Sequence, residues 1–163
     1  MGAVKKDTSQ TCEVRKVELP NAVLLKQVGE LIKEGHTATI YVKGYSMRPF
    51  LEHCRDKVVL AAVGELRPGD AVLAEIRRGV YVLHRIISMD GDRLTLMGDG
   101  NLRGTEQCRL SDVVAIVTHY ISPRRTISAS DPVLCRRIRL WRRLLPVRRY
   151  LLWIYKIKLK LIG

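Results

Sequence analysis

Residues 71–98 read AVLAEIRRGVYVLHRIISMDGDRLTLMG, and this stretch decides the fold. Apolar and β-branched residues fill three short runs, and turn residues separate the runs, which is typical of strands rather than of a helix. The pair Asp90-Gly91 stands between two of these runs and predicts a tight hairpin. We therefore predict antiparallel strands that are joined by short turns.

The same kind of pattern continues on both sides. The runs TATIYVKG (37–44), DKVVLAA (56–62) and DVVAIVTHYIS (112–122) are also strand-like. Five or six short strands in about 80 residues predict a mainly β fold, a small coiled antiparallel sheet or barrel-like domain. Residues 21–34 instead carry Val, Leu and Ile on one face at helical spacing, and Gly35 follows them, so we predict an N-terminal helix there.

Composition divides the chain into four parts. Residues 1–17 are polar and are predicted to form a loose tail, and 18–121 form the β domain. Two prolines and several serines in 122–135 predict a linker. Residues 136–163 form a basic, amphipathic and helical tail.

Charge and cysteine use restrict the partners and the compartment. The net charge is +13, and residues 113–163 hold 12 Lys or Arg and a single acid. Such a segment favours an anionic partner. Four cysteines without a C-x-x-C pair indicate reduced thiols and a cytoplasmic protein. There is no apolar run of the roughly 20 residues that a spanning helix needs. The sequence has no phosphate-binding or metal-ligand motif, so we predict no cofactor and no metal.

Three segments carry candidate chemistry. GYSMRPFL (44–51) places Ser46 in a turn between glycine and proline, YVLHRII (81–87) places His84 in a strand, and LMGDGN (96–101) places Asp99 in a polar turn. Each feature alone also fits a purely structural role: a turn serine, a hydrogen-bonded core histidine and an ordinary Asp-Gly turn.

Read together and in this order, the segments resemble the signal peptidase and LexA-like peptidase superfamily. The resemblance runs from about Tyr41 to Tyr120, and it implies a coiled antiparallel β fold and a serine endopeptidase that cuts after small side chains near a membrane. Members that cleave exported proteins carry an N-terminal spanning helix, whereas this chain shows none. The resemblance therefore implies a peptidase on the cytoplasmic side, peripheral on the inner face of the membrane.

The resemblance also implies roles for individual residues. Ser46 matches the nucleophile and His84 the general base, a position where bacterial members usually have Lys and another branch has His. Asp99 matches the acid of the family turn, and Glu106 is nearest to a second family acid. Gly44 stands where many relatives have a serine that donates to the oxyanion, so that donor is absent here.

A serine hydroxyl must lose its proton as it attacks, and a neutral imidazole accepts it at neutral pH. A carboxylate on the far ring nitrogen would hold the tautomer. Asp99 and Glu106 are the candidates, with Asp99 preferred. The backbone N–H of Ser46 is expected to hold the oxyanion, and Tyr45 and Met47 to shape the substrate groove.

Cys54 follows His53, and neighbouring side chains on a strand point apart. We therefore expect no Cys–His nucleophile at this place.

The tail reads RRIRLWRRLLPVRRYLLWIY over 136–155, with arginine pairs between aromatic and aliphatic residues. A basic amphipathic segment of this kind favours an anchor on an anionic membrane surface. Two alternatives remain open: a helix that docks on the β domain, and a site for nucleic acid or an acidic protein. The predicted anchoring residues are Trp141, Arg142, Arg143, Arg148, Arg149, Trp153 and Tyr155.

The sequence thus predicts a serine endopeptidase of signal-peptidase type that cleaves a leader or precursor peptide at a membrane surface. One alternative is a LexA-like regulator that cuts itself. Another is a non-enzymatic module on a peptidase-like core that binds lipid or nucleic acid.

Overall fold

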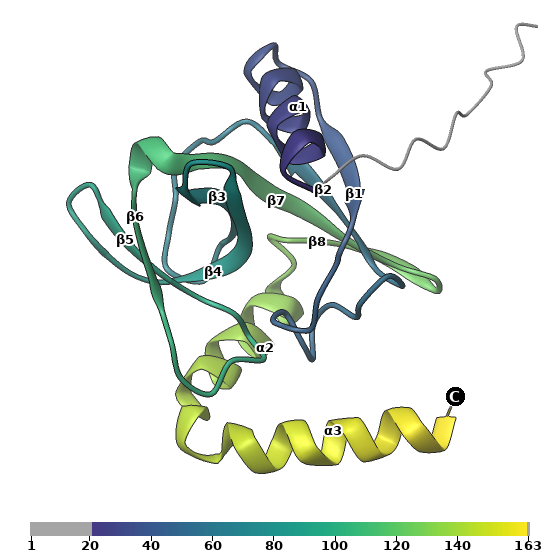
Figure 1. The fold of residues 1–163 in the computed structure, drawn as a ribbon. Helices are drawn as coiled ribbons and strands as arrows, with labels where there is room; N and C mark the ends of the chain where they lie inside the picture. Colours follow the sequence, from purple (N-terminus) through teal and green to yellow (C-terminus); the bar gives the residue numbers. More distant parts are fainter. Residues whose placement is uncertain (1–20, 163) are drawn as a thin grey trace, which may run out of the picture.

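The structure, a computed structural model, describes residues 21–162 (Figure 1). The predicted tail at 1–17 lies outside the described residues. Three helices and eight strands make up the fold, with two short 3₁₀ turns at Leu110–Asp112 and Leu145–Val147. In chain order the elements are α1 (Asn21–Lys33), β1 (Ala38–Tyr41), β2 (Lys57–Ala61), β3 (Ala71–Arg77), β4 (Val80–Asp90), β5 (Arg93–Met97), β6 (Glu106–Arg109), β7 (Val113–Ser122), β8 (Arg125–Ser128), α2 (Pro132–Arg143) and α3 (Arg148–Ile162).

All strand pairs are antiparallel, in the order β1-β2-β7-β3-β4-β5-β6, with β8 also on β7. The predicted mainly β fold and the helix α1 are confirmed, and so is the hairpin at Asp90, which pairs with Arg93. The sheet curls strongly in Figure 1 but does not close into a barrel. Helices α1 and α3 lie on opposite sides of it.

The predicted linker at 122–135 is wrong, because it contains regular structure. Ser122 pairs with Arg125, so β8 forms a hairpin with β7. Asp131 then caps α2 by accepting a hydrogen bond from the Leu134 backbone N–H at 2.8 Å, and Pro132 occupies the first turn. The prolines and serines that suggested a linker are the residues of a hairpin turn and a helix cap.

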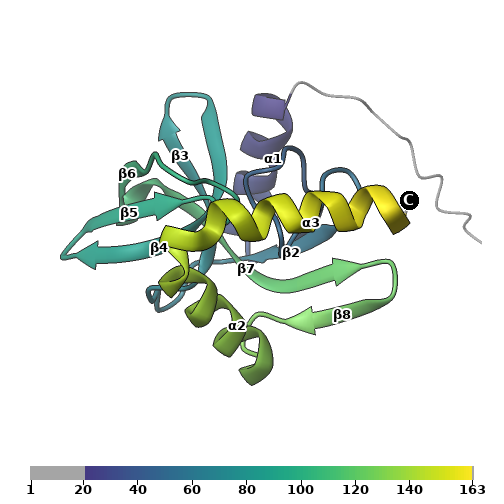
Figure 2. The same ribbon diagram turned by 90° about the horizontal axis from the view of Figure 1, so that it is seen from below.

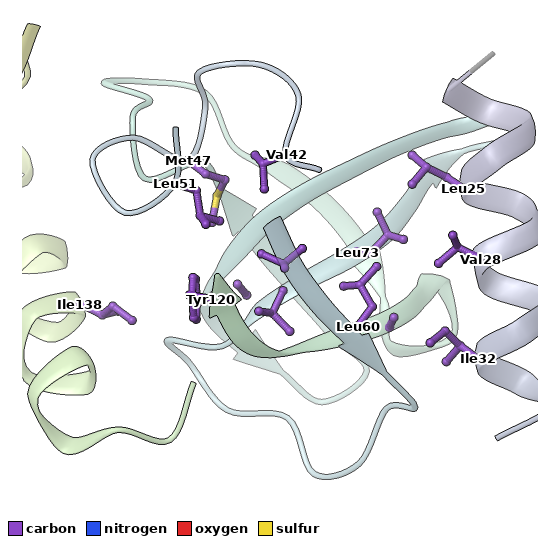
Figure 3. Packing of buried hydrophobic residues seen from close by; sticks show 14 of the residues in the cluster. Leu25, Val28, Ile32, Val42, Met47, Leu51, Leu60, Leu73, Tyr120 and Ile138 are labelled. Atoms are coloured by element: carbon purple, nitrogen blue, oxygen red, sulfur yellow. The ribbon is translucent and has the colours of Figure 1, made fainter. Parts of the chain in front are cut away.

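One face of the sheet forms the larger core, which helices α1 and α2 cover. Figure 3 shows Leu25, Val28 and Ile32 of α1 at one end and Ile138 of α2 at the other, with strand residues between them. Because α2 contributes buried residues to this core, it belongs to the same folded unit as the sheet.

The other face covers a smaller core that includes Val72, Ile86, Leu94 and Leu96. Side chains alternate along a strand, so consecutive residues of β4 point into different cores. His84 shares the face of Ile86, and Arg85 points to the opposite face. Both side chains are buried, and this alternation places His84 and Arg85 in two separate polar clusters.

Candidate functional site

Ser46 rests on the turn that follows β5. The Ser46 carbonyl accepts a hydrogen bond from the Gly100 N–H at 2.7 Å. A Cβ added to Gly98 would lie 2.5 Å from the Ser46 carbonyl oxygen and 2.9 Å from its Cβ, and one added to Gly100 would lie 2.7 Å from the Tyr45 oxygen. These contacts involve backbone atoms that cannot rotate away. The segment 44–51, which carries Ser46, is called the serine loop. Its close approach requires the glycines of the predicted polar turn.

His84 is paired with Glu106. Its Nδ1 lies 2.8 Å from Glu106 Oε2, and the histidine side chain is 8% exposed against 26% for the glutamate. The other ring nitrogen, Nε2, has no hydrogen-bond partner within the described part of the chain. It is not among the fully buried side-chain polar atoms that lack a partner, so it keeps contact with solvent. Glu106 thus fixes the ring while Nε2 stays accessible.

Ser46 and His84 flank the same glycine. Arg85 pairs with Met97, and continuing this antiparallel register by one residue sets Gly98 opposite His84. Directly opposite residues point to the same face of a sheet. The space that a Gly98 side chain would fill beside His84 is occupied by Ser46. By this register Ser46 lies on the side of Gly98 that faces His84 and Glu106, and no direct hydrogen bond joins the serine and histidine side chains in residues 21–162.

The serine loop keeps two backbone donors free. Among the hydrogen bonds of the described residues, none uses the N–H of Ser46 or Met47, whereas the Arg48 N–H bonds to the Tyr45 carbonyl at 3.2 Å. The Gly44 N–H is occupied, because it donates to His53 Nδ1 at 2.8 Å. The predicted Ser46 donor is available at this site, and Gly44 is not.

Asp99 does not orient His84, so the sequence-based preference for it over Glu106 is wrong. Its carboxylate accepts hydrogen bonds from Arg85 Nε at 2.8 Å and Nη2 at 2.6 Å on the opposite face of the sheet. Arg85 also donates to the Gly69 carbonyl at 2.6 Å. The side chains of Arg85 and Asp99 are 1% and 3% exposed. This buried ion pair therefore fixes the polar turn that contains Asp99 to strand β4.

Burial alone would disfavour the Arg85 charge, but Asp99 and the Tyr120 hydroxyl outweigh it and raise the pKa of the guanidinium. Burial likewise raises the pKa of Tyr120, against the opposing effect of Arg85. The Arg85 guanidinium is therefore charged, and its pair with Asp99 gives the turn under Ser46 a fixed support.

Helix α2 docks beside this turn, which corrects the membrane assignment for part of the tail. Trp141 Nε1 donates to the Asp99 carbonyl at 2.8 Å, and Arg142 Nη2 donates to the Ile87 carbonyl at 2.7 Å. Arg148, at the start of α3, is buried and donates to the Asn101 carbonyl at 3.0 Å. Bonded in this way, Trp141, Arg142 and Arg148 attach α2 and the start of α3 to the β domain.

Helix α3 runs across the molecule in front of the sheet in the view of Figure 2. The Tyr155 hydroxyl donates to Glu52 at 3.2 Å, so Tyr155 also faces the domain rather than a membrane. Glu52 in turn binds Arg48 of the serine loop. The remaining predicted anchoring residues, Arg143, Arg149 and Trp153, are exposed.

A groove of about 700 Å³ lies between the serine loop and α3. Tyr45, which was predicted to shape a groove, lines it, together with Gly100. Met47 does not, because it is 1% exposed and belongs to the larger core, so its assignment to the groove is wrong. Helix α3 supplies the other wall through Arg149, Tyr150, Leu152, Trp153 and Lys156.

The reason for excluding a Cys54–His53 pair is also wrong. Both residues lie in a turn, Cys54 has a φ of 53°, and its Sγ lies 3.2 Å from His53 Nε2. This contact is distinct from the cluster at Ser46.

Sequence reasoning missed the residues that join the tail to the site. Trp141 was identified only as one aromatic residue of an amphipathic helix, and nothing local indicates that its indole reaches the turn at Asp99. Its apolar helical spacing with Ile138 did, however, fit the docking alternative.

Among residues 21–162 the structure has no group of three metal-ligating side chains and no helix long and apolar enough to cross a bilayer. Comparison of the chain with protein-family models, with curated proteins and with solved structures finds no match.

Proposed function

We propose that the protein is a serine endopeptidase in which Ser46 is the nucleophile, His84 the general base and Glu106 the residue that orients His84. The observation that carries the proposal is the 2.8 Å contact of Glu106 with His84 Nδ1, which leaves Nε2 accessible on the face where Ser46 lies. This order of acid, imidazole and hydroxyl is the arrangement that activates a serine.

The reaction proceeds in two halves. Ser46 Oγ attacks the peptide carbonyl while its proton passes to His84 Nε2, and Glu106 stabilises the imidazolium. The N–H groups of Ser46 and Met47 stabilise the oxyanion. His84 then gives the proton to the leaving amine as the C–N bond breaks, and a water molecule hydrolyses the acyl-serine by the same steps.

The substrate is a peptide or precursor protein that lies extended in the groove beside the serine loop. Tyr45, Tyr150 and Trp153 offer apolar contacts there, and Arg149 and Lys156 offer positive charge. The groove therefore suits a leader or precursor segment with apolar and acidic side chains.

We also propose that α3 rests on an anionic membrane surface. Its outward side carries a stripe of exposed apolar side chains at helical spacing, and the chain from 132 to 163 contains no acid. Tyr150 and Trp153 belong to both the stripe and the groove, so a membrane-bound substrate would meet the groove directly. The stripe consists of Tyr150, Trp153, Ile154, Ile157 and Leu161.

The peptidase proposal is tested with a peptide library and mass analysis of the products, using wild type and Glu106→Gln. Wild type is expected to cleave. Glu106→Gln is expected to lower kcat by about 10²-fold to 10⁴-fold with little change in KM, because the imidazolium loses its counter-charge while the groove is unchanged.

Glu65→Gln is the matched control, because Glu65 is exposed, lies outside the strands and pairs with Arg67 rather than with His84. It should cleave at the wild-type rate. Equal activity of wild type and Glu106→Gln contradicts the role of Glu106, and absence of any cleavage contradicts the peptidase proposal. A chain that cuts only itself favours the self-cleaving alternative.

The membrane proposal predicts flotation of the full chain with vesicles that contain anionic lipid. Replacing Trp153, Ile154 and Ile157 by Ser should lower the bound fraction by about tenfold or more, because the apolar contact is lost.

Val133 and Leu140 are exposed apolar residues of α2, and their replacement by Ser is the control. If both variants float like wild type, α3 is not the membrane contact.

A further inference from the structure

A second pocket, about 400 Å³ in volume, lies where the end of α2 meets the start of α3. Four of its lining residues are arginines, from the end of α2 and the start of α3, and no acid lines it. An apolar floor completes it. The lining consists of Ile87, Met97, Leu145 and the arginines Arg139, Arg142, Arg143 and Arg148.

Residues 21–162 do not balance the positive charge of this pocket. Within them, Arg148 is 3% exposed, donates only to neutral groups and leaves its Nε without a partner. Asp99 is the carboxylate whose charge reaches Arg142 and Arg148, but it is already bound in bidentate fashion by Arg85. A buried guanidinium without a counter-ion is costly, and an anion in the pocket would offset that cost.

Burial and the charge of Arg85 lower the pKa of Arg148, against the opposing effect of Asp99, and the same causes lower that of Arg142. The environment thus disfavours both charges until an anion arrives. Each guanidinium group carries several N–H donors, and four of them line this one pocket, which suits the oxygen atoms of a phosphate group.

We propose that this four-arginine pocket is a binding site for a phosphate group, carried either by a free anion or by a lipid headgroup. Bound phosphate would join the end of α2 to the start of α3. Because Trp141 and Arg148 bond to the turn that supports Ser46, the ligand would also stabilise that turn. The proposal stands on the pocket and does not require that the protein is a peptidase.

The test uses the full chain at constant ionic strength, with inorganic phosphate replacing chloride. At a phosphate concentration about a hundredfold above the dissociation constant, the Tm of wild type should rise by about 5–10 °C. The variant R139Q/R143Q should lose this rise. Both side chains are exposed and make no hydrogen bond among the described residues, so the fold should persist.

The control R136Q/R137Q removes the same charge from exposed positions of α2 that do not line the pocket, and it should keep the full rise in Tm. A second arm measures flotation of both variants with phosphatidylcholine vesicles that contain phosphatidic acid. A selective loss of the Tm rise in R139Q/R143Q identifies free phosphate as the ligand, and a selective loss of flotation identifies the headgroup. No selective loss in either arm overturns the proposal.

Discussion

Replacing Ser46 by Ala is expected to lower kcat/KM for peptide hydrolysis by about 10⁴-fold to 10⁶-fold. The substitution removes only the attacking oxygen. The Ser46 carbonyl still accepts the Gly100 N–H, and the close contact with Gly98 involves atoms that alanine retains. The variant should therefore keep the circular dichroism spectrum and the Tm of wild type. The rate is measured with a peptide that the library experiment identifies.

His84→Ala should cause a loss of similar size, and the double variant should be no worse than either single one, because residues that act as one unit are not additive. Glu106 then loses its partner but remains in reach of water. Ser88→Ala, an exposed serine on the same strand as His84, is the control and should leave the rate unchanged. Hydrolysis by Ser46→Ala at the wild-type rate would exclude Ser46 as the nucleophile.

Local patterns predicted most of the β fold. Alternation of apolar residues located β1, and a β-branched apolar run located β2. The Asp90-Gly91 pair located the β4–β5 hairpin, and helical spacing before Gly35 located α1, which ends at Lys33. These features depend on neighbours in the chain. The segment 122–135 failed because composition does not distinguish a linker from a hairpin turn followed by a helix cap.

The partner of His84 could not be predicted because it depends on register across three strands. Asp99 lies in the polar turn that carried the sequence motif, but its side chain is on the face of Arg85, while Glu106 lies on the face of His84. A shift of one residue in a strand exchanges the two faces. Register therefore decides between the two acids, and the motif alone could not.

The basic tail shows a similar limit. An amphipathic stripe predicts that one face is covered, but it does not say by what. In α2 the cover is the β domain itself, through Ile138 and Trp141, whereas the exposed stripe of α3 has no cover within residues 21–162. The sequence-based prediction assigned both helices to one anchor because their compositions are alike.

Breaking the buried ion pair is expected to cause the largest loss of stability. Asp99→Asn leaves the Arg85 charge buried without a carboxylate, and Arg85→Gln leaves the Asp99 charge in the same position. Each variant should lose about 3–5 kcal/mol of the free energy of unfolding. The measurement is denaturant unfolding, with the midpoint lowered and the slope unchanged.

The double variant tests whether the loss comes from the pair. In R85Q/D99N both charges of the pair are removed together, so the double variant should be more stable than the sum of the two single losses predicts. Arg67→Gln, which breaks the exposed Arg67–Glu65 pair, should leave the midpoint unchanged. Strict additivity of the two single losses would show that each side chain acts separately. Coupled losses would instead show that Arg85 and Asp99 support the turn under Ser46 as one unit. A variant that folds without this pair should then retain the sheet but lose the geometry of the serine loop.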